Sequence, residues 1–487
     1  MPPQLTPLVQ TIQGIRLANT ASNKPEPTWN ITISPQGTIS SITPNTTSSP
    51  PLSTPLALPS LVHPHIHLDK AYIHNTPSYS HLLPRTGSFN EALTSTTQAK
   101  ASFTPADLLK RGEWLLAESV SSGVTAMRAF VEVDATVQHA CLNAGLTLKE
   151  KWKEACEIQL VVFAQDPIFS TESGQENRRL VGDALREYGP DRLSVLGTTP
   201  YVESSVEAAR RNIEWAVDMA LETDRHLDFH LDYNLSPPDE DPEPLIWYVL
   251  RMLREKCWTT HSTTKRVMLG HCTRLSLFRE EDWSRLTQEI QDYDIPASFV
   301  GLPTSDLYMA SIPTPTQGGG GRLGVKSNPR GTLPIPDMIR KYGLDAVMGV
   351  NNVGNAFTPW GSIDPLSIAC LGVGIYQAGT LDDAELLYEC ISTRARTAIG
   401  LSSSLSASAS DPGVRPNCGE SADLLLLYDI DDTGCLEDGG ASRPRKSMAE
   451  VVWDPPARMS RAVVSRGRVK MPALSACSND AFRFVAT

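Results

Sequence analysis

Between residues 60 and 400, short apolar runs alternate with longer segments whose apolar positions recur at helical spacing. Together with the apolar run that leads up to His65, eight runs predict buried strands: 56–62, 123–131, 158–163, 193–197, 227–231, 267–271, 296–300 and 346–351. The intervening patterns predict helices at 105–120, 136–156, 175–188, 204–222, 244–256, 282–292 and 334–342. This alternation is typical of a parallel (β/α)8 TIM-type barrel of the α/β class.

The two ends of the chain follow a different pattern. Short β-like segments punctuated by Ser, Thr, Asn, Pro and Gly occur at 8–12, 29–33, 38–42, 422–428 and 461–469. We expect them to form a small antiparallel β-sandwich domain built from both termini, with 1–57 and 403–487 flanking a barrel at 58–402. Segments 402–420 and 431–447 are predicted loops. The glycine run at 318–321 lacks the context of a phosphate-binding loop and is predicted to be a flexible loop, with part of a mobile lid as the alternative.

Composition narrows the function classes. The 487-residue chain is 40% hydrophobic and 20% charged, and its formal net charge is −12. An acidic chain without a basic cluster is a poor match for nucleic acid or an anionic membrane. There is no signal-peptide pattern or run of membrane-spanning length, and the nine cysteines contain no Cys-x-x-Cys pair. We therefore expect a cytoplasmic protein that acts on a small-molecule substrate, with a homo-oligomer as an open option.

Polar residues collect where the predicted strands end. They are His65, His67, Arg128, Gln165, His230, His271 and Asn351. Residues two apart on a strand point to the same side, so the imidazoles of His65 and His67 can reach one point. The carboxyl ends of barrel strands carry the chemistry in this architecture, and neutral imidazole is the commonest metal ligand. The pattern favours a metal site over scattered histidines.

Five short motifs resemble the amidohydrolase superfamily, and within it the cytosine deaminase-like branch. They are His65-Ile66-His67-Leu68-Asp69, Phe163-Ala164-Gln165-Asp166-Pro167-Ile168, His230-Leu231-Asp232, Gly270-His271-Cys272 and Gly349-Val350-Asn351-Asn352, and the segment Phe357-Thr358-Pro359-Trp360 adds to the likeness. The resemblance implies one divalent metal, zinc or iron, held by His65, His67 and His230. It further implies that Gln165 holds a planar heterocycle, that His271 contacts the water or the substrate, and that the reaction is hydrolysis of a C–N bond.

The sequence departs from that family at its proton-handling acids. Asn351 stands where the family has an aspartate, and Asn352 replaces a neighbouring acid. Tyr233, whose phenol has an ordinary pKa near 10, stands where the deaminases have a glutamate. We therefore assign catalytic roles to His271, Asn351 and Asp232. For Asp232 a purely structural role is the alternative.

Further side chains are candidates for contact with the substrate: Gln165, Tyr233, Asp306 and Trp360. A structural role is the alternative for Asp306, and a place in the core is the alternative for Trp360. Asp69 is expected to orient a ligand histidine or to cap a turn. Lys70 is expected to be exposed, with a substrate contact as the alternative.

Two function classes remain open. The first is a metal-dependent hydrolase of a cyclic amide, amidine or nitrogen heterocycle that uses a substitute proton shuttle. The second is a diverged barrel that performs a lyase, isomerase or cyclisation step, with or without metal, or that only binds a ligand. The retained histidines favour a metal or a polar pocket, and the missing acids favour altered chemistry.

Overall fold

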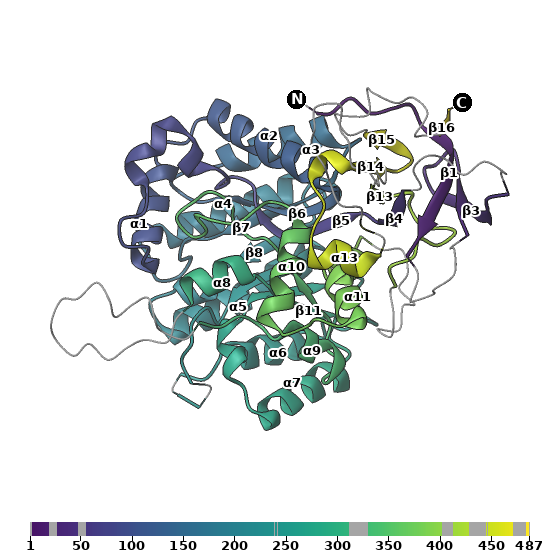
Figure 1. Ribbon diagram of the computed structural model, residues 1–487. Coiled ribbons are helices and arrows are strands. Elements are labelled where there is room, and N and C mark those ends of the chain that lie inside the picture. Colours follow the sequence, from purple (N-terminus) through teal and green to yellow (C-terminus); the bar gives the residue numbers. More distant parts are fainter. Residues whose placement is uncertain are drawn as a thin grey trace.

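A computed structural model describes residues 2–18, 27–46, 55–237, 239–240, 242–310, 330–401, 413–427, 445, 447–470 and 484–486. The glycine run and most of the two loop segments predicted after residue 401 lie outside the described residues. Figure 1 shows a central barrel with helices around it and a second sheet beside it.

The barrel confirms the predicted architecture. Its eight strands pair in parallel in the order β12-β11-β10-β9-β8-β7-β6-β5. The first and last strands meet where His67 N donates to Asn351 O at 2.8 Å and Asn351 N donates to His65 O at 3.1 Å. The ring is thereby nearly closed at the level of the histidines. The strands are β5 (Leu61–His67), β6 (Val124–Glu132), β7 (Glu157–Ala164), β8 (Val195–Thr198), β9 (His226–Leu231), β10 (Val267–His271), β11 (Ala297–Gly301) and β12 (Ala346–Met348).

Helices surround these strands close to their predicted positions. The α-helices are α1 (Phe89–Lys100), α2 (Pro105–Ser122), α3 (Ala140–Trp152), α4 (Gly174–Glu187), α5 (Val206–Glu222), α6 (Ile246–Glu255), α7 (Glu280–Asp292), α8 (Pro303–Met309), α9 (Ile335–Arg340), α10 (Pro365–Ile375), α11 (Leu381–Glu389), α12 (Thr393–Ala398) and α13 (Met448–Trp453). Short 3-10 turns lie at η1 (Ile73–Asn75), η2 (Pro77–Leu82), η3 (Pro200–Val202), η4 (Thr273–Leu277) and η5 (Arg458–Ser460).

Helix α2 shows how local sequence sets these bounds. The Thr104 side chain accepts a hydrogen bond from Asp107 N, and Pro105 follows at the first helical position. The helix ends at Gly123, whose φ of 115° favours glycine. A Cβ at Gly123 would lie 2.9 Å from a methyl group of Leu425 in the second sheet, so this position also allows the barrel and that sheet to approach closely.

The second sheet collects strands from both chain ends, as predicted. Its order is β15-β14-β13-β4-β1-β2-β3, and β16 pairs with β1. The strands are β1 (Val9–Leu17), β2 (Trp29–Ile33), β3 (Ile39–Pro44), β4 (Leu56–Pro59), β13 (Leu424–Leu427), β14 (Arg461–Ser465), β15 (Arg468–Lys470) and β16 (Phe484–Ala486). The prediction that this sheet is antiparallel is wrong for one pair: the sheet is mixed, because β1 and β4 are parallel whereas its other pairs are antiparallel.

The apolar run 56–62 was predicted as one strand, and this is wrong. Residues Leu56–Pro59 form β4 of the second sheet, and the barrel strand β5 begins at Leu61. Ser60 is the point of change: its backbone N donates to Asp423 O at 3.1 Å, and its hydroxyl lies 2.5 Å from Thr125 Oγ1. Both strands are fully buried, so hydrophobicity alone does not separate them.

Helix α12 packs against the barrel interior. Ala395, Ala398 and Ile399 form a buried apolar cluster with Val62, Met268 and Val347 from three barrel strands. The backbone carbonyl of Ile399 accepts a hydrogen bond from Arg128 at 3.0 Å. Arg128 was predicted at a strand end, but β6 continues to Glu132, so Arg128 lies within the strand and in the barrel interior.

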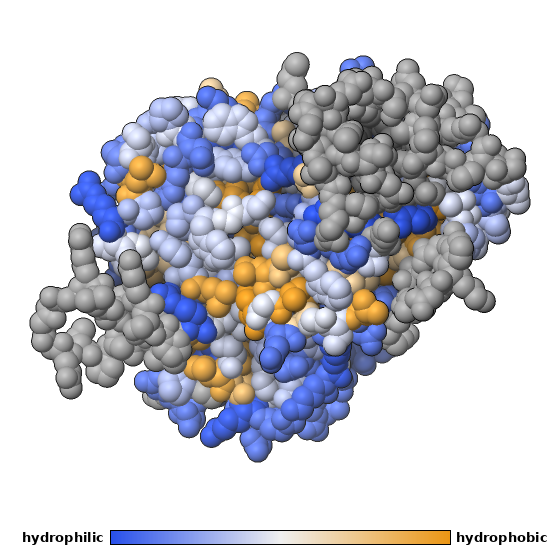
Figure 2. Space-filling model, in the orientation of Figure 1, coloured by the Kyte–Doolittle hydropathy of each residue, from blue (hydrophilic) through white to orange (hydrophobic). Residues whose placement is uncertain are grey.

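Figure 2 shows hydrophobic side chains gathered near the middle of one face, where α10 lies in Figure 1. Leu371, Val373 and Ile375 of this apolar helix are only partly buried. Association of two copies of the chain into a homo-oligomer stays a prediction. Within the described residues, no helix combines the length and the apolar character needed to cross a bilayer.

Candidate active site

Three imidazoles converge inside the barrel at the ends of β5 and β9. His65 Nε2 lies 3.2 Å from His230 Nε2, and His67 Nε2 lies 3.1 Å from the same atom. All three side chains are buried. The structure therefore brings together the three residues predicted to bind metal, and their ring nitrogens form a cluster that could hold an ion.

An irregularity in β5 explains why these histidines point into the barrel whereas the neighbouring His63 does not. His63 precedes His65 by two residues, yet its Nε2 lies 3.2 Å from Ser119 Oγ on α2, outside the barrel. The pairing of β5 with β6 shifts register between His63 and Ile66. This shift breaks the simple alternation of sides, so His63 points outward whereas His65 and His67 point inward.

The separations of His65 and His67 from His230 fit one shared ion. Tetrahedral ligands at about 2.0–2.1 Å from zinc stand roughly 3.3 Å apart, close to the separations of 3.1 and 3.2 Å found here. Burial, reinforced by neighbouring cationic groups, lowers the pKa of His65, His67 and His230 well below the ordinary value. Neutral imidazole is the form that offers a lone pair to a metal.

A buried ion pair lies beneath the cluster. Asp228 Oδ2 is 3.2 Å from Arg128 Nη1, and Asp228 Oδ1 is 3.9 Å from His65 Nδ1. Burial raises the pKa of Asp228 to about 7, although Arg128 opposes the shift. Gln159 completes the group by accepting a hydrogen bond from Arg128 Nε at 2.6 Å. The Asp228 carboxylate therefore lies near His65 Nδ1 but beyond hydrogen-bonding distance of it.

His271 lies beside the histidine cluster, and Asp306 orients its ring. Its Nδ1 is 2.9 Å from Asp306 Oδ1, which leaves Nε2 for another partner. The second carboxylate oxygen of Asp306 accepts hydrogen bonds from Leu302 N and Thr332 Oγ1. The Tyr233 ring packs on His271 with centroids 4.0 Å apart. Asp306, predicted as a substrate contact, is fully buried and acts on the pocket through His271.

Asn351 occupies the position facing the histidines. Its Nδ2 donates to Ser305 Oγ at 2.8 Å, whereas its buried Oδ1 has no partner among the described residues. Its φ of 68° is left-handed, an uncommon conformation for a residue other than glycine.

A pocket opens above the metal-site candidate. Its described lining residues are His67, Lys70, Gln165, Tyr201, His230, Tyr233, His271, Asn351, Asn352 and Phe357. Gln165 and Tyr233 thus lie where a substrate contact was predicted. Burial raises the pKa of the Tyr233 phenol far above its usual range, so this side chain stays protonated and cannot replace a glutamate as a base.

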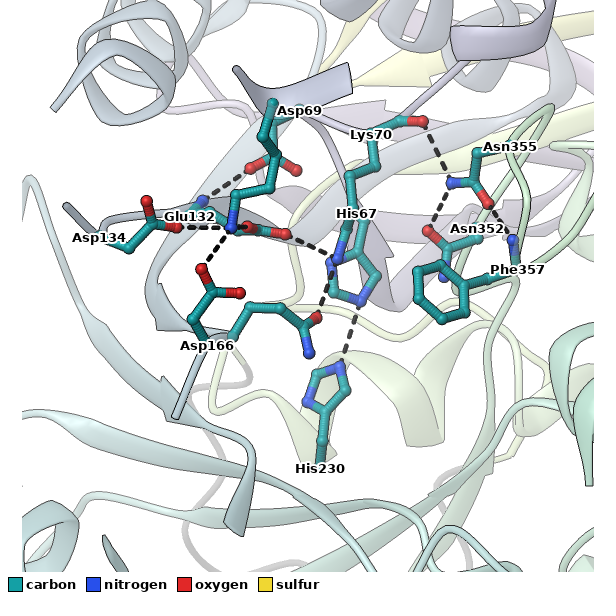
Figure 3. Close-up of polar contacts among 12 residues, drawn as sticks. His67, Asp69, Lys70, Glu132, Asp134, Asp166, His230, Asn352, Asn355 and Phe357 are labelled. Carbon is teal, nitrogen blue, oxygen red and sulfur yellow. Dashed lines mark hydrogen bonds and ion pairs between the residues drawn. The ribbon is translucent and has the colours of Figure 1, made fainter. Parts of the chain in front are cut away.

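Lys70 was expected to be exposed, and this is wrong. It is 1% exposed, and its Nζ donates to Gln165 Oε1 at 3.0 Å and pairs with Glu132 Oε1 at 2.9 Å (Figure 3). The backbone carbonyl of Lys70 also accepts a hydrogen bond from Asn355 Nδ2 at 3.1 Å. The alternative, a substrate contact, agrees with its place in the pocket lining.

Two predicted site residues lie apart from this pocket lining. Asp232 accepts hydrogen bonds from Leu245 N at 2.8 Å and Ile246 N at 3.0 Å, at the start of α6. It borders a separate pocket together with Arg274. These contacts support the structural alternative for Asp232. Trp360 is 45% exposed and is not part of the core, and its predicted substrate contact has no support from the pocket lining.

Sequence reasoning missed a buried charge cluster next to the pocket. Lys100 Nζ lies 2.6 Å from Glu132 Oε2, 2.6 Å from Asp134 Oδ2 and 3.0 Å from Asp166 Oδ2. Asp69 accepts a hydrogen bond from Glu132 N at 2.7 Å, and its role in orienting a ligand histidine or capping a turn stays a prediction. The sequence signal for this cluster was a pair of acids at the end of an apolar strand: Glu132 is the last residue of β6, and Asp134 follows it.

Comparison with known proteins gives structural likeness only. No family model matches the chain, and no curated protein matches its sequence. The structure is similar to 5-methylcytosine deaminase from Klebsiella pneumoniae, with a TM-score of 0.73 at 20% identity over 95% of this chain and 97% of that one.

Two further solved structures are similar over nearly the whole chain. N-isopropylammelide isopropylaminohydrolase from Burkholderia multivorans has a TM-score of 0.68 at 20% identity, over 97% of this chain and 100% of that one. An adenosine deaminase from Xanthomonas campestris with bound zinc has a TM-score of 0.58 at 16% identity, over 96% and 94% of the two chains. At such identities these likenesses establish the class of fold, a barrel with an attached sheet of terminal strands.

Proposed function

We propose that this protein is a metal-dependent hydrolase of the amidohydrolase superfamily that cleaves a C–N bond in a small nitrogen heterocycle or cyclic amide. The observation that carries the proposal is the convergence of His65, His67 and His230 on one point beneath a polar pocket. A divalent ion, zinc or iron, would polarise a water molecule or a substrate oxygen at that point when bound. The solved structures named as deaminases and as an aminohydrolase favour the same reaction class.

The protein's own groups supply the other requirements of such a reaction. Gln165 is held by Lys70, and its amide can hydrogen-bond to a planar ring. His271 is held through Nδ1 by Asp306, so its Nε2 can take a proton from the attacking water or donate one to the leaving nitrogen. His271 with Asp306 is the substitute for the acids that the sequence lacks, because Asn351 cannot carry a proton and Tyr233 stays protonated.

A non-hydrolytic reaction is the second candidate. Among the described residues that line the pocket there is no carboxylate, and the side chains at the family's two acid positions are an amide and a phenol. A lyase, isomerase or cyclisation step that needs only polarisation and a histidine would be compatible with this lining.

Product analysis separates the two candidates. Purified protein loaded with zinc or with ferrous iron would be incubated with cytosine-like heterocycles and cyclic amides. Release of ammonia or ring opening with incorporation of ¹⁸O from labelled water is the expected result. Conversion without ¹⁸O incorporation would favour the second candidate. A His271→Ala protein that retains full hydrolytic activity would contradict the proposed role of His271.

A further inference from the structure

The pocket contains one fixed cation of its own. Lys70 is the only Lys or Arg among the described lining residues. An ammonium has three N–H donors, and in the described structure Gln165 and Glu132 take two of them. We propose that the third serves an anionic oxygen of the substrate, so that the pocket selects heterocycles that carry a carboxylate or an ionised imide. The inference rests on the proposed function and adds a substrate class to it.

The ammonium is fixed in place by its surroundings. It lies 5.6 Å from the centre of the Phe163 ring and 5.8 Å from that of Phe357, in addition to its contacts with Gln165 and Glu132. Figure 3 shows Glu132 on one side of Lys70 and Phe357 on the other. A charged donor that is already oriented loses little conformational freedom when a ligand binds.

Glu132 is shared between Lys70 and a second ammonium group. Its Oε1 pairs with Lys70 at 2.9 Å, but its Oε2 pairs with Lys100 at 2.6 Å, so one carboxylate is shared between two ammonium groups. Glu132 is 1% exposed and is not among the lining residues. The acids Asp134 and Asp166 contact Lys100 rather than Lys70. Three carboxylates therefore balance the two ammonium groups, but all three lie outside the pocket lining, where Lys70 is the charged donor.

The remaining lining groups are compatible with a bound anion. They are amides, phenols, imidazoles and one phenylalanine, and none of the described ones is a carboxylate. An ion held by the three histidines would add positive charge on the same side. A negatively charged ring would be attracted, whereas a cationic amine would be repelled by Lys70.

Binding of two matched probes tests this selection. Orotate and uracil share a pyrimidine ring and differ by one carboxylate. Titration calorimetry with the full-length, zinc-loaded protein should give an affinity for orotate at least about tenfold higher than for uracil, the size of one charge-assisted hydrogen bond. Lys70→Met should abolish the preference, and Lys70→Arg should retain part of it. Lys341→Met, which alters a half-exposed lysine, should change nothing.

The Lys70→Met protein leaves Glu132 with one partner fewer and could fail to fold. The double variant Lys70→Met, Glu132→Gln removes both charges and gives the same test in a balanced cluster. Equal affinity for the two probes, no measurable orotate binding, or a preference that survives both variants would overturn the inference. Hydrolysis of neutral cyclic amides that does not depend on Lys70 would leave the proposed function standing without it. Lys70-dependent orotate binding by a protein that cleaves no C–N bond would support the inference and contradict the proposed function.

Discussion

The Asn351 amide donates from Nδ2 to Ser305 Oγ at 2.8 Å, and this contact determines which end of the amide remains available to the candidate metal site. With the nitrogen engaged by Ser305, Oδ1 is the free end, buried and without a partner among the described residues. An amide oxygen is a weaker metal ligand than a carboxylate and cannot accept a proton at neutral pH.

Replacing Asn351 by Asp should therefore tighten metal binding. The new carboxylate has nearly the same size, and the Ser305 hydroxyl can turn to donate to it. We expect the metal dissociation constant, measured by competition with a chelator, to fall by at least about tenfold, since charge-assisted contacts are roughly twice as strong as neutral ones. Trace hydrolysis should rise in parallel if the protein is a hydrolase. If Asn351 serves a new reaction, the native activity should fall instead.

Asn352→Asp is the matched control for that change, because it adds the same charge one residue away. Equal tightening by both variants would indicate a general charge effect rather than a direct contact of residue 351. No change in metal affinity or activity with Asn351→Asp would remove this residue from the site.

The double variant His65→Ala, His67→Ala should lose metal binding. Two of three converging nitrogens disappear, and one imidazole cannot hold the ion alone. Elemental analysis after dialysis measures the result. His63→Ala is the control on the same strand, because His63 points toward Ser119, and its protein should keep the wild-type metal content. Stoichiometric metal in the double variant would contradict the assignment of these histidines as metal ligands.

Asp306→Asn should reduce the turnover number with little effect on metal content. Asp306 fixes the His271 ring through Nδ1, and an amide can present its nitrogen there and disturb that orientation. General acid–base catalysis contributes roughly 10²- to 10⁴-fold, so we expect a loss within that range. Steady-state kinetics with the substrate found in the product screen, together with elemental analysis, measures both quantities. In a His271→Ala background the same change should have little further effect, and additive losses would contradict the coupling.

Unfolding of the metal-free protein should become easier as the pH falls below about 6.5, in part through His226. Burial, then Arg128 and other cations, lowers the pKa of this imidazole to about 2. The unfolded chain takes up a proton below its ordinary pKa of 6.5, whereas the folded protein does not, so the stability present above 6.5 is lost toward acid. The loss is about 1.4 kcal/mol per pH unit for one such group.

His226→Gln should remove that contribution, because its amide can still accept the hydrogen bond that His226 Nδ1 receives from Arg266 N. Denaturant unfolding at pH 7 and pH 5 should show a smaller difference in free energy for the variant, by roughly 2 kcal/mol. Identical pH dependence in the two proteins would show that His226 is already protonated when folded.

The sequence by itself determined the barrel, because each of its strands and helices is encoded by a local pattern of residues. Every apolar run at 123–131, 227–231 or 267–271 can be recognised without its neighbours, and strand–helix repetition leaves one common closed arrangement. The clustering of strand-end histidines followed from the same logic, since a barrel brings strand ends together, whereas the choice of three of them as ligands came from the family resemblance. The division of 56–62 between two sheets did not follow from that logic, because both strands are buried and equally apolar.

Only the tertiary structure decided which way each strand-end side chain points and what it contacts. A shifted register in β5 sends His63 outward and His65 inward, and no local pattern records such a shift. Lys70 looks like a surface lysine until Glu132, from another strand, is placed 2.9 Å away. The charge cluster around Lys100 likewise joins residues from separate elements. Such partners are distant in sequence, and only the closed barrel brings them within reach of one another.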